Sequence, residues 1–269
     1  SLLNRQPSLG GAPCFVSVDF TGKFAVTANY AGGNFVMYPI GEDGKLVAAS
    51  ENSMHRGFGP DRDHPQDPHA HSISFAPGGN YALGCDLGLD RIFVYQLEPT
   101  NGRLLPHAET AVAAGSGPRH LAFHPNETVV YVINETGGTV ATFAWDAGAG
   151  LLGEMQTIST VPADYTGPTW CADVHVHPNG KFVYGSNRGH DSIVIYRVDQ
   201  ATGRLALLGH ESTRGQTPRN FALSPDGALL LVANQDSSSV VVFRVDPDTG
   251  KLTHMATNDI PTPTCLKFA

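Results

Sequence analysis

The sequence predicts an all-β fold built from repeated four-stranded units, and three observations support this prediction. First, the 269-residue chain contains 30 glycines and 19 prolines, which is typical of a β-rich protein with many turns. Second, no apolar pattern with a 3.6-residue period continues for as many as ~12 residues, so we expect little helix. Third, one pattern of strands and turns recurs five times along the chain.

Each copy of the pattern has a short strand, a P-x-G-like turn, an apolar strand, an Asn/Asp-rich turn and a second apolar strand. Clear copies are "ISFAPGGNYALGCDLGLDRIFVYQL" and "VHVHPNGKFVYGSNRGHDSIVIYRV". Most copies continue into a further turn ("EDGKL", "TNGRL", "ATGRL", "DTGKL"), which predicts a fourth strand. The first residue of each P-x-G-like turn, here called the anchor, is Phe20, Pro77, Pro125, Pro178 or Pro225. Four strands in roughly 45–50 residues match one blade of a β-propeller, and a flat solenoid is the weaker alternative.

The two ends of the chain also fit the repeat. "SLLNRQ" occupies the place of a repeat's last strand, and "PTPTCLKFA" occupies the place of a first strand. We therefore expect five whole blades with a partial strand at each end, and one β-propeller domain over residues 1–269. Either N-terminal blades of a longer propeller are missing, or a short ring closes in an unusual or oligomeric way. The oligomeric state is not predicted.

Composition limits the classes of ligand. The formal net charge is −8 and there is no run of Lys or Arg, which argues against nucleic acid. A local arginine cluster could still bind an anionic small molecule. Cys14, Cys85, Cys171 and Cys265 lie far apart without a CxxC motif, so we expect no metal, no cofactor and a cytoplasmic location. No apolar run approaches the ~20 residues of a membrane-spanning helix, so no membrane association is expected.

One position of the repeat varies in a way that a core position would not. Six residues before the anchor, at what we call the lining position, stand Cys14, His71, Arg119, Ala172 and Arg219. The inner strands of a propeller converge on its axis, so equivalent residues of different blades should meet there. Three ionisable residues at this position predict a surface that binds a ligand.

A second variable position lies ten residues after the anchor and holds Tyr30, Leu87, Glu135, Arg188 and Gln235. The residue before it is always Asn or Asp, as in Asn29, and turn capping explains that choice. Both variable positions should lie on one face of the propeller. We therefore expect His71, Arg119, Glu135, Arg188 and Arg219 to cluster, with Asn29, Tyr30 and Gln235 as further candidate contacts. A ring of salt bridges between blades is the alternative interpretation.

The histidines are interpreted from their place in the repeat. In "PHAHS", His69 and His71 should share one side of an inner strand, and neighbouring arginines disfavour a metal ion between them. His124, His175 and His177 are expected to pack or to bond to turns. Asp173 follows the lining position and is a candidate to face the channel. The segment 51–66, the longest departure from the repeat, is a candidate lid.

Several stretches resemble a known family. "GFGPDRDHPQDPHAHS", "GSGPRHLAFHP", "VINE", "ADVHVHPNGKFVYGSNRGHDSI" and "TPRNFALSPDG" are similar to the lactonase-type seven-bladed propellers, over the whole chain and in order. That family includes 6-phosphogluconolactonase and 3-carboxy-cis,cis-muconate lactonizing enzyme. The family's chains are longer at the N-terminus.

The resemblance implies metal-free opening or closing of a small anionic lactone. Its proposed catalytic residues correspond here to His71, Arg119, Glu135 and Arg188, with His69 as the neighbouring alternative to His71 and a candidate substrate contact. The repeat position, and not the resemblance, adds Arg219 as a further substrate contact. The favoured prediction is hydrolysis of a sugar lactone such as 6-phosphogluconolactone, with His71 or Glu135 as base. A muconate-type cycloisomerase and a non-enzymatic binding propeller are the alternatives, and assays with both substrates would separate them.

Overall fold

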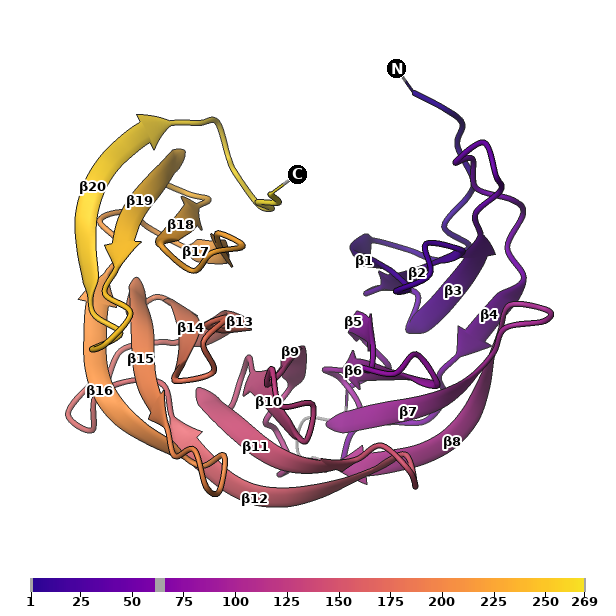
Figure 1. Cartoon of the computed structure of the whole chain (residues 1–269), viewed down its shortest axis with the longest axis horizontal. Coiled ribbons are helices and arrows are strands. Elements are labelled where there is room, and N and C mark those ends of the chain that lie inside the picture. Colours follow the sequence, from indigo (N-terminus) through magenta and orange to yellow (C-terminus); the bar gives the residue numbers. More distant parts are fainter. Residues whose placement is uncertain (1, 61–65, 269) are drawn as a thin grey trace. The chain divides into compact units, whose positions relative to one another are not determined.

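The computed structural model describes residues 2–60 and 66–268, and these form five four-stranded antiparallel sheets without a helix (Figure 1). In every sheet the strands pair in the order of the sequence. Each sheet is therefore an up-and-down blade, as predicted. The predicted low helix content is also confirmed for these residues.

The strands are as follows. The first sheet contains β1 (Pro13–Val18), β2 (Phe24–Asn29), β3 (Asn34–Pro39) and β4 (Glu51–Met54). The second contains β5 (Ala70–Phe75), β6 (Tyr81–Asp86), β7 (Arg91–Glu98) and β8 (Arg103–Ala111). The third contains β9 (Pro118–Phe123), β10 (Val129–Asn134), β11 (Thr139–Asp146) and β12 (Leu151–Ser159). The fourth contains β13 (Trp170–Val176), β14 (Phe182–Arg188), β15 (Ser192–Val198) and β16 (Leu205–Ser212). The fifth contains β17 (Pro218–Leu223), β18 (Leu229–Asn234), β19 (Ser239–Val245) and β20 (Leu252–Asp259).

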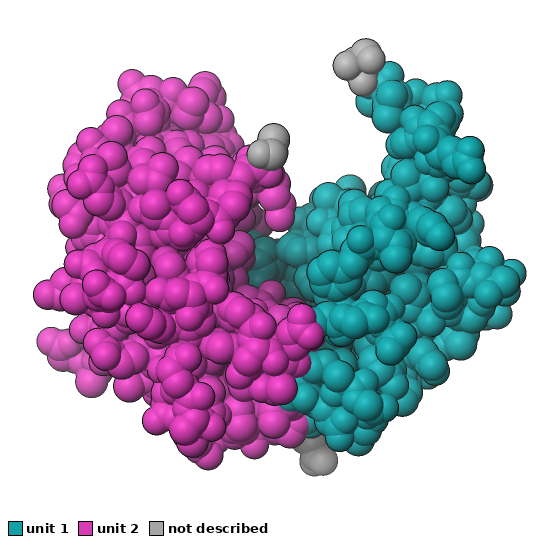
Figure 2. Space-filling view, viewed as in Figure 1, with its two compact units in different colours: residues 1–120, 145–152 teal, residues 121–144, 153–269 magenta. Residues whose placement is uncertain are grey.

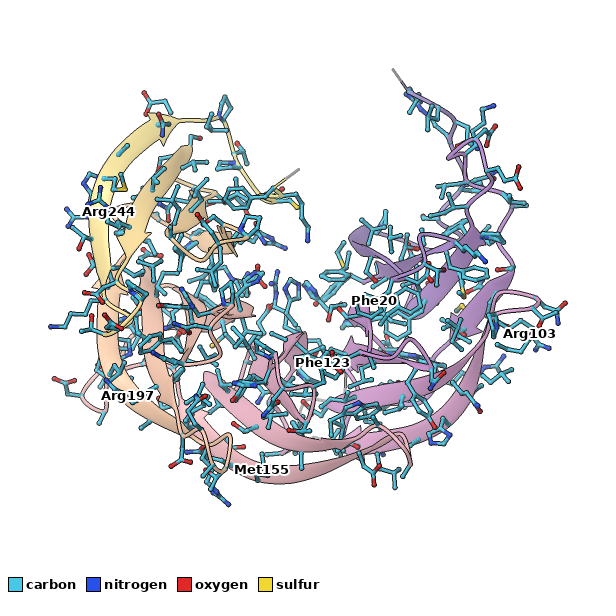
Figure 3. All side chains as sticks on the ribbon, in the orientation of Figure 1. Phe20, Arg103, Phe123, Met155, Arg197 and Arg244 are labelled. Carbon is cyan, nitrogen blue, oxygen red and sulfur yellow. The ribbon has the colours of Figure 1, made fainter. Side chains whose placement is uncertain are left out.

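The turn between the first and second strands of each blade has the same backbone form. Two residues after the anchor the φ angle is positive in every blade, at Gly22, Gly79, Glu127, Gly180 and Gly227. Glycine adopts this conformation without a steric penalty, which explains its frequency there. The anchor itself is proline except for Phe20, whose side chain is 71% exposed beyond the end of β1 (Figure 3).

The chain divides into two compact units (Figure 2). Unit 1 comprises Ser1–His120 and Trp145–Leu152, and it contains the first two blades. Unit 2 comprises Leu121–Ala144 and Gly153–Ala269, and it contains the last two blades. The strands of the third blade are divided between the two. A single domain over residues 1–269 stays a prediction.

The hydrophobic core of each unit lies between neighbouring blades. In unit 1, Phe35 and Met37 of the first blade pack with Ile73 and Tyr95 of the second. In unit 2, Tyr184 packs with apolar side chains of the last two blades, including Phe243. Each Å² of apolar surface that these large side chains remove from water stabilises the fold by roughly 25 cal/mol. The blades therefore stabilise one another.

The hydroxyl groups of two core tyrosines are paired with turn carbonyls. Tyr131 Oη donates to the Gly203 carbonyl oxygen at 2.8 Å, and Tyr184 Oη donates to that of Gly250 at 2.9 Å. Gly203 and Gly250 belong to the recurrent "TGRL" and "TGKL" turns. These turns therefore satisfy polar atoms that would otherwise be buried without a partner.

Two histidines link successive blades within unit 2. His124 Nε2 lies 2.8 Å from the Gly180 carbonyl oxygen, and His177 Nε2 lies 3.1 Å from that of Gly227. The other ring nitrogen, Nδ1, accepts the backbone N–H of Asn126 or Asn179. The prediction that His124 and His177 bond to turns is confirmed.

The segments at the two ends differ from the sequence prediction. Residues 2–12 and 260–268 form no strand. Isolated backbone bonds hold them, from the Tyr30 N–H to the Ala12 carbonyl oxygen and from the Ile260 N–H to that of Ser238. Side-chain bonds add to these, from Asn4 Nδ2 to the Leu46 carbonyl oxygen and from the Leu266 N–H to Asn220 Oδ1. No helix in the described residues is long and apolar enough to span a membrane.

The segment 51–66 is only partly a loop. Its first residues form β4, the outer strand of the first blade. The Gly59 N–H donates to the Gln66 carbonyl oxygen at 2.9 Å, which closes the base of the excursion. Residues 61–65, the central part of the candidate lid, lie outside the described residues.

Candidate functional site

The lining position coincides with an irregularity of the inner strands. The pairing register shifts between Pro13 and Phe15, and at the equivalent places around His71, Ala172 and Arg219. A bulge redirects the side chain of the extra residue and bends the strand. The side chains at the lining position therefore need not follow the alternation of a regular strand, in which successive side chains point to opposite faces of the sheet.

Within unit 1, four predicted site residues come together with His120. The Tyr30 ring stacks on His69 with centroids 4.3 Å apart, and it meets the edge of His71 at 5.7 Å. His71 contacts His120 at 5.1 Å, and His120 Nε2 lies 3.5 Å from Arg119 Nη1. His71 is 4% exposed and Arg119 is 2% exposed. This cluster combines a buried guanidinium with imidazoles, which suits an anionic ligand.

A buried network supports the chain just before His71. Asp86 Oδ1 accepts the His69 N–H at 2.8 Å, while Oδ2 lies 2.5 Å from His55 Nδ1. His55 Nε2 lies 2.8 Å from Tyr95 Oη. Asp86, His55 and Tyr95 are buried. The network fixes the backbone that presents His69 and His71, and it joins the first blade to the second.

Within unit 2, Glu135 and Arg188 form an ion pair, with Arg188 Nη2 2.9 Å from Glu135 Oε2. Their side chains are 13% and 18% exposed, Arg188 being the more buried. Arg188 Nη2 also donates to the Cys171 carbonyl oxygen at 3.0 Å, and Nε donates to that of Trp170 at 3.2 Å. The guanidinium is therefore held in one orientation at the beginning of β13.

Asp173 forms a second polar group in unit 2. Its Oδ2 accepts Asn220 Nδ2 at 2.6 Å and lies 3.2 Å from His175 Nε2. The Val174 N–H donates to Oδ1 at 3.0 Å. The Asp173 carboxylate therefore fixes the orientation of the His175 ring. We expected His175 to pack or bond to a turn; it contacts the Phe221 ring but pairs with Asp173.

Arg219 and Gln235 are the remaining site residues of unit 2. The half-buried guanidinium of Arg219 makes no hydrogen bond or ion pair with another described residue. Gln235 Oε1 is buried and has no hydrogen-bond partner within residues 2–60 and 66–268. An uncommitted guanidinium can bind a phosphate or carboxylate, and an uncommitted carbonyl oxygen can accept a hydroxyl hydrogen.

We expected the recurrent Asn or Asp of the turn after the second strand to cap that turn by accepting backbone N–H groups. Asp86 does so, since its Oδ1 accepts the Leu89 N–H at 3.0 Å, whereas asparagines at this position donate to carbonyl oxygens of other segments. Asn29 Nδ2 donates to the Ser8 carbonyl oxygen at 2.9 Å. Asn187 Nδ2 and Asn234 Nδ2 donate to the carbonyl oxygens of Thr160 and Thr213. Asn29 is buried, and this bond gives it a structural role beside Tyr30.

The predicted residues are divided between the two units. Contacts within the units join Tyr30, His69, His71 and Arg119 through His120, and join Glu135 to Arg188. Unit 1 holds Asn29, Tyr30, His69, His71 and Arg119, and unit 2 holds Glu135, Arg188, Asp173, Arg219 and Gln235. Sequence reasoning did not select His120, His175 or the His55–Asp86 pair. Asp173 and His175 could have been recognised from their i, i+2 spacing on one strand. Among the described residues, no group of three or more His, Cys, Asp or Glu could hold a metal ion.

These up-and-down blades, with polar side chains at the start of the inner strands, define a protein of the β-propeller class. Residues 1–268 match the family described as lactonase, 7-bladed beta-propeller. A 6-phosphogluconolactonase of Bacillus subtilis is 38% identical over 269 residues, covering all of this chain and 76% of that protein. The chain belongs to this lactonase family.

Other relatives agree with this assignment. A 6-phosphogluconolactonase of Formosa agariphila is 38% identical over 228 residues, covering 82% of this chain and 64% of that protein. The solved structure of a Pseudomonas aeruginosa periplasmic gluconolactonase is 32% identical with a TM-score of 0.90, covering 97% of this chain and 74% of that chain. A solved structure from Bacteroides fragilis is 38% identical with a TM-score of 0.91, covering 99% of this chain and 76% of that chain.

Proposed function

We propose that this protein hydrolyses a small sugar lactone that carries an anionic group, with 6-phosphogluconolactone as the first candidate. The names of the Bacillus subtilis and Formosa agariphila relatives support the reaction class. The single observation that carries the proposal is the set of arginines at the blade ends. Arg119 is buried beside the His120 imidazole, Arg188 is paired with Glu135, and Arg219 makes no hydrogen bond or ion pair with another described residue.

The residues of unit 1 suit the attack on the ester carbonyl. His71 would take a proton from the attacking water, and Arg119 would donate hydrogen bonds to the oxygen on which negative charge develops. General base catalysis contributes about 10²–10⁴-fold and a positioned oxyanion donor about 10²–10³-fold. Sugar lactones hydrolyse readily, so these two contributions are sufficient for a useful rate.

The residues of unit 2 suit recognition of the substrate. Arg219 would bind the phosphate or carboxylate, because guanidinium groups donate two parallel hydrogen bonds to such anions. Arg188 is oriented by Glu135 and by two backbone carbonyl oxygens, so it can add a fixed positive charge. Glu135 is the alternative base. That both sets act on one substrate molecule is a prediction of the repeat pattern.

The test compares 6-phosphogluconolactone with unphosphorylated gluconolactone at matched concentration, and each rate is corrected for spontaneous hydrolysis. We expect kcat/KM to be higher for the phosphorylated lactone, and we expect Arg219→Gln to reduce that preference. The muconate assay serves as the control for the cycloisomerase alternative. Turnover of 3-carboxymuconate but neither lactone would contradict the proposal. A cytoplasmic location stays a prediction, since one similar structure is a periplasmic gluconolactonase.

A further inference from the structure

The turn between the second and third strands of each blade contains one residue in the left-handed backbone region. Thirteen residues after the anchor, φ lies between 50° and 61° at Gly33, Asp90, Gly138, Asp191 and Ser238. Glycine adopts this conformation at little cost, whereas a residue with a Cβ atom is strained there. The three non-glycine residues therefore keep a side chain at a position that favours glycine. Strain of this kind often marks a functional constraint.

The side chain of Asp90 bonds to the loop that precedes Arg119. Asp90 Oδ2 accepts the Gly115 N–H at 2.8 Å, and Oδ1 accepts the Gly117 N–H at 2.7 Å. Asp90 is 4% exposed, and its backbone carbonyl accepts the Val112 N–H at 3.0 Å. The Asp90 carboxylate is thus fixed in the second blade. It holds the loop that leads into the first strand of the third blade, which we call the lead-in loop.

Asp191 makes the equivalent contact in unit 2. Asp191 Oδ1 accepts the Thr217 N–H at 2.9 Å, two residues before Arg219. The Asp191 backbone carbonyl accepts both the N–H and the hydroxyl of Thr213. The same design therefore precedes both arginines of the lining position.

Thr217 itself is strained. It is β-branched, its φ is 58°, and it precedes Pro218, a combination that the free chain avoids. Three hydrogen bonds hold it: to Asp191, from the Gln235 N–H to its carbonyl oxygen, and from its hydroxyl to Asp236. The direction in which the chain enters the bulge at Arg219 is therefore imposed by these partners.

The pattern across the repeats connects the aspartates with the arginines. Asp90 and Asp191 stand in the turns that precede the two blades whose lining residue is arginine, Arg119 and Arg219. Gly33 and Gly138 precede the blades whose lining residue is His71 or Ala172. An aspartate with a positive φ angle therefore precedes each of the two blades whose lining residue is arginine.

We infer that Asp90 and Asp191 are positioning residues, which fix the strained lead-in loops so that Arg119 and Arg219 are presented to the anionic groups of the substrate. They act through the backbone N–H groups of the lead-in loops. This inference rests on the proposed function for the identity of the substrate. The positioning of an anion-binding arginine can be tested without that reaction.

The informative variant is Asp191→Gly, because glycine is the residue of two other blades at this position. It removes the carboxylate and also relieves the backbone strain, so the variant should fold. The matched control is Asp199→Gly in the turn between β15 and β16. The Asp199 carboxylate accepts two backbone N–H groups, those of Ala201 and Thr202, as the Asp191 carboxylate accepts those of Thr217 and Gly189. Thermal midpoints of both variants report any general loss of stability.

The measurement is the affinity for inorganic phosphate, by calorimetry, in four proteins: the parent, Asp191→Gly, Arg219→Gln and the double variant. We expect Asp191→Gly to weaken phosphate binding about tenfold, and to add nothing when Arg219 is already absent, because residues that act as a unit are not additive. Asp199→Gly should leave phosphate binding unchanged. Asp191→Asn, which retains an acceptor oxygen, should restore most of the affinity.

Several results would overturn the inference. These are unchanged phosphate affinity in Asp191→Gly, an equal loss in the Arg219→Gln background, or no phosphate binding by the parent protein. The lactone assay is run in parallel. A parent that binds phosphate with the expected coupling but hydrolyses neither lactone would retain this inference and remove the proposed function.

Discussion

Arg188 Nη2 lies 2.9 Å from Glu135 Oε2, and both side chains are mostly buried at the ends of neighbouring second strands, β10 and β14. The repeat places these residues at one equivalent position in successive blades. Their contact shows that this position converges between blades of unit 2, as the repeat predicts. Their roles in catalysis stay predictions.

Replacing either partner of this ion pair should affect stability and turnover together. We expect Arg188→Gln to reduce the free energy of unfolding by about 1–2 kcal/mol, because Glu135 then lacks its counter-charge in a mostly buried place. A double-mutant cycle with Glu135→Gln, followed by urea unfolding, gives the coupling energy directly. A coupling energy near zero would contradict the view that the pair orients the site.

The His55–Asp86 pair should be essential for the stability of unit 1. His55→Ala leaves the buried Asp86 carboxylate without its imidazole partner, and we expect a loss of about 3 kcal/mol. Tyr95→Phe removes only the hydroxyl next to His55 Nε2 and should cost about 1 kcal/mol. Chemical denaturation followed by intrinsic fluorescence measures both. Equal effects of the two variants would show that the carboxylate does not depend on His55.

Replacing a histidine that links two blades of unit 2 should lower the stability of the protein without changing the candidate site directly. His177→Ala removes the bond to the Gly227 carbonyl oxygen and the acceptor of the Asn179 N–H. Leaving these groups unsatisfied should cost about 1–3 kcal/mol. The control is His254→Ala on the exposed strand β20, which should change stability by no more than about 0.5 kcal/mol. KM for the lactone should stay unchanged in both variants.

Stability should fall in alkali because of the buried phenols. Burial raises the pKa of Tyr131 and of Tyr184 above the ordinary value of 10.0, and it raises the pKa of the Cys85 thiol to about 12. Above the ordinary values the unfolded chain loses these protons while the folded chain retains them, so unfolding becomes more favourable as pH rises. The thiol adds pH dependence from about pH 8 and the phenols from about pH 9, because those are the values near which the unfolded groups begin to lose their protons.

Urea midpoints measured between about pH 8 and 11 test this expectation. We expect a flat region followed by a decline, and Tyr184→Phe should make the decline less steep. Midpoints that stay constant up to pH 11 would show that the phenols are not protected by folding.

The strands and blades could be predicted from the sequence because each blade repeats the same local signals. β-branched and aromatic runs separated by Gly, Pro and Asn turns specify strands without knowledge of the partner blade. The link made by His177 could also be predicted, since its place beside the turn recurs at His124. β4 was not predicted within segment 51–66, because its pairing with β3 outweighs its weak local pattern.

Contacts between residues far apart in the sequence could be predicted only where both residues occupy equivalent positions of the repeat. The meeting of Glu135 and Arg188 follows from their equivalent positions in the repeat. The pairing of His55 with Asp86 does not, because His55 has no counterpart of the same type in other blades. The strain at Asp90 and Asp191 could not be predicted either, since aspartate is common in ordinary turns.

The most direct test of the proposed reaction is the effect of Arg119 on lactone hydrolysis. The measurement is kcat/KM for 6-phosphogluconolactone, corrected for spontaneous hydrolysis, in the parent protein and in Arg119→Ala. Thermal midpoints establish that both proteins are folded. We predict a loss of about 10²–10³-fold, because the oxygen that becomes negative in the transition state loses its donor. An Arg119→Ala variant that is folded and retains full turnover would contradict the account.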